Sequence, residues 1–144
     1  MNKYLILLLS LTLLTSACQK MGRETPEAVT KSFQAKYPGE NDPDWRIDRN
    51  GNYEAHFKKS GIHYRADFSP AGTWIETENS VKKKELPEAI TKLLKDKYDD
   101  HKIVELEFVT HHQKGEFYDL ELKPKGEDKF DLMVKANGQV IGRD

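Results

Sequence analysis

This sequence has few cysteines, few long apolar runs and no clear excess of charge of either sign. Cys18 is the only cysteine among 144 residues, so no disulfide can form within the chain. Lys and Arg total 23 against 24 Asp and Glu, and this balance gives no electrostatic basis for binding nucleic acid. No Gly-x-Ser-x-Gly motif of a nucleophilic serine occurs. We therefore expect neither enzyme activity nor a cofactor.

The most apolar part of the chain is its N-terminus. Residues 4–14 are almost all apolar, but a bilayer-spanning helix needs about 20 such residues. Lys3 precedes this run and the small residues Ser16 and Ala17 follow it, which is the order found in an export signal. Residues 1–17 are therefore predicted to be a signal peptide.

The end of this signal resembles the lipobox of bacterial lipoproteins, with Thr15 where that family usually has Leu. The resemblance implies cleavage before Cys18 and attachment of lipid to its thiol. Residues 18–24 would then be a polar tether. Burial of acyl chains is worth about 0.8 kcal/mol per methylene, so several chains anchor a protein firmly to a membrane. Gln19, where Asp would signal inner-membrane retention, favours the outer membrane, with the protein facing the periplasm or the exterior.

The rest of the chain contains an internal repeat. Residues 26–37 align with residues 87–98 at an offset of 61, and seven of the twelve positions are identical. Each segment has Pro-Glu-Ala at its start and apolar residues at i, i+4 and i+8, a pattern typical of an amphipathic helix of about three turns. Two equivalent helices are therefore predicted.

Alternation of apolar and polar residues follows each helix and predicts strands with one buried face. The predicted strands are residues 45–47, 53–57, 64–68 and 73–75, then 103–109, 118–122, 130–134 and 139–141. We expect a single domain at 25–143, with repeat one at 25–79, a linker at 80–85 and repeat two at 86–143. A unit of 60 residues is marginal alone, so the repeats should share one core. The fold class is α+β: two tandem α-β-β-β-β repeats, with two helices on one face of an antiparallel sheet.

The order of these motifs resembles the PepSY-like proteins, which are similar in fold to the β-lactamase inhibitor protein. The resemblance rests on Pro-Glu-Ala and a closing Tyr in each helix, Trp45, Tyr-x-Ala-x-Phe at 53–57, Gly-Thr-Trp-Ile at 72–75 and Leu-Pro at 86–87. It implies a small exported protein without a catalytic signature, for which protein binding or inhibition is the expected theme. No inhibitory residue can be carried over.

The solvent-facing residues of the two repeats differ in charge. The first repeat is predicted to expose a mixed set: Arg46, Glu54, His56, His63, Arg65 and Asp67. The second is predicted to expose carboxylates with two apolar side chains, and these form the candidate partner-binding face: Glu105, Glu107, Phe117, Asp119, Glu121, Asp131 and Met133. Clustered charge with apolar anchors favours docking of a protein or peptide. The resemblance to PepSY-like proteins implies that such docking could serve inhibition. In the other interpretation, lysines such as Lys123, Lys129 and Lys135 pair with these carboxylates and the face is merely solvated.

A different class of function would use histidines. His56 and His63 lie on the two strands of one predicted hairpin, so the alternative hypothesis is a binder of a small ligand or metal ion. No three-ligand pattern supports a metal site. Trp45 and Trp74 stand at predicted strand starts, where we expect them to pack at the edge of the core.

Overall fold

The computed structural model of the protein describes residues 24–144, so the predicted signal peptide and the lipidation site Cys18 lie outside the described residues. Its elements are α1 (Glu27–Lys36), β1 (Asp44–Ile47), β2 (Tyr53–Lys59), β3 (Ile62–Phe68), β4 (Trp74–Ser80), a 3-10 turn (Lys83–Glu85), α2 (Glu88–Lys97), β5 (Lys102–His111), β6 (Gly115–Lys123), β7 (Phe130–Val134) and β8 (Val140–Arg143). The strands form one eight-stranded sheet in the order β1 to β8, and every neighbouring pair is antiparallel. The predicted α+β repeat is confirmed.

Both helices cover the same face of this sheet. Residues paired across neighbouring strands share a face, and Ala66 beneath α1 pairs with Thr77, which pairs with Thr110 of β5. Leu106 lies four residues from Thr110 along the same strand, hence on the same face, and it pairs with Leu120 beneath α2. The face that carries the helices is therefore continuous across the sheet.

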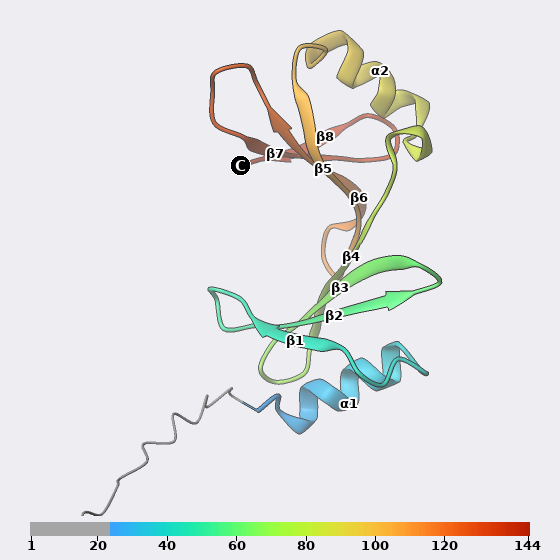
Figure 1. Ribbon diagram of the computed structural model, residues 1–144, viewed down its shortest axis with the longest axis vertical. Helices are drawn as coiled ribbons and strands as arrows, with labels where there is room; N and C mark the ends of the chain where they lie inside the picture. Colours follow the sequence, from blue (N-terminus) through green and yellow to red (C-terminus); the bar gives the residue numbers. More distant parts are fainter. Residues whose placement is uncertain (1–23) are drawn as a thin grey trace, which may run out of the picture.

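The helices nevertheless lie at opposite ends of the molecule (Figure 1). Neighbouring strands twist by about 20–25°, and seven successive pairings accumulate to slightly less than half a turn. The helix-bearing face therefore points in nearly opposite directions at its two ends. The expectation of one shared core is wrong for this reason: α1 and α2 each cover a separate cluster of buried side chains.

The cluster beneath α1 is aromatic. Phe33 of α1 is buried, and its ring meets those of Trp45, Phe57 and Phe68 edge-on at centroid distances of 5.4, 5.3 and 6.2 Å. Edge-to-face geometry adds to the hydrophobic burial of such rings. Trp74 packs against the same cluster, so the expected core packing of both tryptophans is confirmed.

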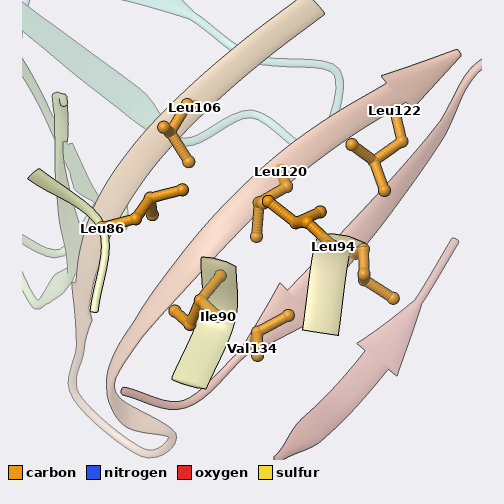
Figure 2. Close-up of a cluster of buried hydrophobic side chains, with 8 residues drawn as sticks. Leu86, Ile90, Leu94, Leu106, Leu120, Leu122 and Val134 are labelled. Atoms are coloured by element: carbon orange, nitrogen blue, oxygen red, sulfur yellow. The ribbon is translucent and has the colours of Figure 1, made fainter. Parts of the chain in front are cut away.

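The cluster beneath α2 is aliphatic instead. Figure 2 shows Ile90 and Leu94 of α2 facing Leu120, Leu122 and Val134 of β6 and β7. Each fully buried side chain of this size contributes about 1.5–3 kcal/mol. The repeats thus keep one backbone plan while filling their cores with different residue types.

A turn glycine approaches the helix in both repeats. Gly72 precedes β4 with φ +83°, and a Cβ atom there would lie 2.5 Å from the carbonyl oxygen of Ala28 in α1. Gly138 precedes β8 with φ +85°, and a Cβ atom there would lie 3.2 Å from the carbonyl oxygen of Ala89 in α2. Only glycine tolerates both a positive φ and so close an approach of the turn to the helix backbone. This explains why the Pro-Glu-Ala start of the helix and the turn glycine recur together in the two repeats.

The fourth strand is longer than predicted. β4 runs from Trp74 to Ser80, whereas the sequence predicted residues 73–75 and a linker from residue 80. The strand continues because β4 pairs on both sides, with β3 and with β5, and Ser80 still faces Glu107. This β4–β5 pairing joins the two repeats into one sheet.

Candidate functional site

The acidic residues predicted to face outward lie together on the helix-free face of the sheet. A hollow of about 220 Å³ opens there, which we call the acidic hollow; its lining residues are Arg65, Glu78, Glu105, Glu107, Asp119, Glu121 and Asp131. Cross-strand pairing assembles it, because Glu105 pairs with Glu121 and Glu107 pairs with Asp119. All five predicted carboxylates therefore line one concave site.

Two lining residues come from the first repeat and were not part of the predicted face. The Arg65 Nη2 atom lies 2.7 Å from Glu78 Oε1, and Arg65 Nε lies 3.3 Å from Asp67 Oδ1. The sequence predicted Arg65 on a separate, mixed face and did not assign Glu78. The alternation of Glu76, Thr77 and Glu78 after Trp74 was the signal that the strand continues.

Only two cations among the described residues pair with this cluster. Besides Arg65, Lys129 Nζ lies 2.5 Å from Glu121 Oε2. Lys135, which the solvated interpretation would pair with a carboxylate, instead donates to the backbone carbonyls of Lys114 and Glu116. The carboxyl groups therefore outnumber the cations that lie near them.

Burial and mutual repulsion raise the pKa values of several carboxyl groups on this face. Burial raises the pKa of Glu78 well above its ordinary value; Arg65 opposes the shift and the charge of Glu107 adds to it. Burial, partly offset by Arg65, raises the pKa of Asp67 to about 7. Burial and the charge of Asp131 raise the pKa of Asp119 to about 6. These groups keep protons to higher pH than an exposed carboxyl does because ionising one adds charge to an already acidic site.

Some polar atoms of the cluster lack hydrogen-bond partners. Glu78 Oε2 and Asp119 Oδ1 are buried without a partner, and so are Arg65 Nε and Asp67 Oδ1, which form an ion pair at 3.3 Å without hydrogen-bond geometry. A buried oxygen without a partner costs about 1–3 kcal/mol. The acidic hollow is therefore costly to the fold as it stands.

The two apolar members of the predicted face do not act as exposed anchors. Phe117 is only 3% exposed, because it pairs with Val109 and the amines of Lys114 and Lys135 lie 5.8 and 5.9 Å from its ring centroid. Met133 lies on the same face but is half-buried, with Lys114 Nζ 3.6 Å from its sulfur. The prediction that Phe117 is exposed is wrong, since neighbouring lysine chains cover it.

The predicted histidine pair does not form. His56 pairs with Arg65 and lies 3.1 Å from Glu54 Oε2, while His63 pairs with Lys58. Within residues 24–144, no group of three or more His, Cys, Asp or Glu side chains is arranged to hold a metal ion. Nor is any helix in this part of the chain long and apolar enough to cross a membrane.

The fold defines a class of protein by its likeness to solved structures. A BLIP-like protein from Bacteroides fragilis matches with a TM-score of 0.71 at 15% identity, over 84% of this chain and 86% of that chain. This antiparallel α+β sheet with two helices is thus a β-lactamase-inhibitor-like fold. The chain belongs to the family described as "Putative beta-lactamase-inhibitor-like, PepSY-like", whose model matches residues 51–142. The predicted resemblance is confirmed.

Further solved structures share the fold. A DUF2874 family protein from Bacteroides uniformis has a TM-score of 0.75 at 17% identity, covering 84% of this chain and 89% of that chain. A protein from Bacteroides eggerthii, described as "putative periplasmic", has a TM-score of 0.74 at 19% identity, covering 84% of this chain and 88% of that chain. No curated protein matches the chain. At these identities the likeness establishes the fold, and the function has to be argued from the site.

Proposed function

We propose that this protein is a non-enzymatic binding protein of the cell envelope that holds a protein or peptide partner on the helix-free face of its sheet. The observation that carries this proposal is the acidic hollow, which is lined by six carboxyl groups and a single guanidinium group. Inhibition of the partner is the finer form of this function that the β-lactamase-inhibitor-like fold favours.

The charge of the face supports a binding role over mere solvation. Carboxylates without neighbouring cations in a concave site attract a positively charged partner and fix its position on the face. A face that served only solubility would leave its carboxylates in water, whereas Glu78 is 6% exposed. The buried oxygens of Glu78 and Asp119 that lack partners are explained if a bound partner supplies further hydrogen-bond donors.

The position of the protein in the cell is a second part of the proposal. Cys18 is the proposed lipid attachment site, and the likeness to a periplasmic protein supports an envelope location. We propose an outer-membrane anchor with the domain facing the periplasm. Replacing Cys18 by Ala should abolish incorporation of labelled palmitate and release the protein from the membrane fraction. Continued labelling of the variant would refute lipidation at this residue.

The binding proposal is tested by site-specific photo-crosslinking in intact envelopes. A photoreactive residue at Ser80, which is exposed and pairs with Glu107 beside the hollow, should capture a discrete partner. The same residue at Gln34, exposed on α1, is the control and should not capture it. Capture from both positions, or from neither, would contradict a binding site on the helix-free face.

Charge reversal then tests which residues contribute. Changing Glu105, Glu107 and Glu121 together to Lys should abolish capture from Ser80, because the face becomes cationic. Reversing the exposed Glu27, Glu88 and Glu127 changes the net charge equally and should leave capture intact. Equal loss in both triple variants would show that net charge, and not this face, governs capture.

A further inference from the structure

The acidic hollow has dimensions that suit an organic cation. Liquid water occupies about 30 Å³ per molecule, so a hollow of about 220 Å³ has room for several waters or for one alkylammonium or guanidinium group. Its carboxyl groups come from four neighbouring strands, β4 to β7, and surround the space from several sides. A single positive group placed there would face several carboxylates at once.

The arrangement of the oxygens disfavours a metal ion as the occupant. Calcium needs six to eight oxygens at about 2.3–2.6 Å, which requires carboxylates converging on one point. In the part of the chain that the structure describes, no three such side chains converge in this way. A larger cation with several N–H donors fits carboxylates that are spread around a hollow.

Buried oxygens without partners on residues that line the hollow are a second, independent indication of a ligand. Glu78 lines the hollow with a side chain only 8% exposed, and although Oε1 contacts Arg65, Oε2 has no partner. Asp119 also lines it, and Asp119 Oδ1 is likewise buried without a partner. A cationic N–H donor from outside the chain would satisfy acceptors of this kind.

Asp119 is a lining carboxyl group whose pKa is raised to about 6 by burial and by the charge of Asp131. It has no cation of its own among the described residues, unlike Glu78 beside Arg65 and Glu121 beside Lys129. Titratable and charged groups lie on each strand around this site. They include Glu54 and His56 on β2, Arg65 and Asp67 on β3, Glu76 and Glu78 on β4, Glu105, Glu107 and His111 on β5, Glu121 on β6, Asp131 on β7, Lys129 in the preceding loop and Asp144 after β8.

We propose, building on the function proposed above, that the acidic hollow binds the cationic end of one lysine or arginine side chain of the partner, and that its entry drives a proton from Asp119 into solvent. The carboxylic acid of Asp119 loses its proton to water, and the resulting carboxylate pairs with the incoming ammonium or guanidinium group. No other bond is formed or broken.

The coupling follows from competition between a proton and a cation for one carboxylate. Because the pKa of Asp119 is raised to about 6, the group is largely protonated at pH 5 and ionised at pH 7.5. A ligand that binds only the ionised form loses affinity about tenfold for each pH unit below this pKa. Affinity for a cationic probe should therefore rise about tenfold between pH 5 and pH 7.5.

The probe is acetylated, amidated tetralysine, titrated into the folded domain by calorimetry at pH 5, 6 and 7.5. At pH 6, titrations in two buffers of different ionisation enthalpy report the protons released, and about half a proton per bound peptide is expected. Asp119→Asn should bind with an affinity that has lost most of this rise. Asp131→Asn removes a charge that raises the pKa of Asp119, so the rise in affinity should move to lower pH.

Matched variants distinguish binding of the peptide in the acidic hollow from nonspecific electrostatic attraction to the protein. Glu105→Gln with Glu121→Gln should weaken the probe more than tenfold at pH 7.5, whereas Glu27→Gln with Glu88→Gln should not change its affinity. The proposal is overturned if affinity is independent of pH, if Asp119→Asn keeps the wild-type rise, or if calcium alone displaces the peptide at equal concentration. If tetralysine does not bind while Ser80 still captures a partner, this proposal fails and the proposed function stands.

Discussion

Replacing Gly72 by Ala should destabilise the protein more than the same change at any equivalent turn. Gly72 and Gly126 have nearly the same φ, +83° and +81°, so the conformational cost of a side chain is about 1 kcal/mol at both. Only at Gly72 would the new Cβ lie 2.5 Å from Ala28 O, whereas nothing lies within 4 Å at Gly126. Forcing α1 away from the turn adds about 1–3 kcal/mol. The expected losses are about 2–4 kcal/mol for Gly72→Ala and about 1 kcal/mol for Gly126→Ala.

Urea unfolding followed by circular dichroism measures this difference. With a slope of about 2 kcal/mol per M, a loss of 3 kcal/mol lowers the midpoint by about 1.5 M. Gly138→Ala should fall between the other two, because its contact with Ala89 O would be 3.2 Å. Equal midpoints for the Gly72 and Gly126 variants, at unchanged slope, would refute the close approach of turn and helix as the reason for the repeated glycine.

Three further predictions concern the helix-free face. Asp67 keeps its proton to about pH 7 in the folded protein but only to its ordinary pKa of 3.8 when unfolded. The free energy of unfolding should therefore fall by on the order of 2–4 kcal/mol as pH rises from 4 to 7. Asp67→Asn should reduce this dependence of the unfolding free energy on pH, measured by urea unfolding, and an unchanged dependence would contradict the assignment. Arg65→Met leaves Asp67, which is ionised at pH 9, without its cation, so the loss of stability should be up to about 3 kcal/mol greater at pH 9 than at pH 5, where the carboxyl is neutral; a loss independent of pH would argue against the pair. Phe117→Ala should cost about 3–5 kcal/mol in thermal unfolding, and a loss near zero would restore the exposed placement predicted from sequence.

Much of the fold could be predicted because its signals are local. Helical spacing in residues 26–37 and 87–98 and alternation in the strands each depend on a few neighbouring residues, and repetition confirmed the order of elements. The outward direction of Glu105, Glu107 and Glu121 followed from the same alternation, since side chains on a strand alternate between its two faces. The end of β4 was missed because pairing with β5, and not local pattern, extends it to Ser80.

The sequence by itself determined two helix-and-strand repeats, the shared helix face and the acidic character of the opposite face, because each follows from residue periodicity along one segment. Only the tertiary structure decided how the segments combine. Pairing of β4 with β5 brings Arg65 and Glu78 of the first repeat among the carboxylates of the second, and the twist of the sheet divides the expected single core into two. Both outcomes depend on contacts between residues far apart in the chain, and cross-strand register and accumulated twist leave no trace in the spacing of residues along a single strand.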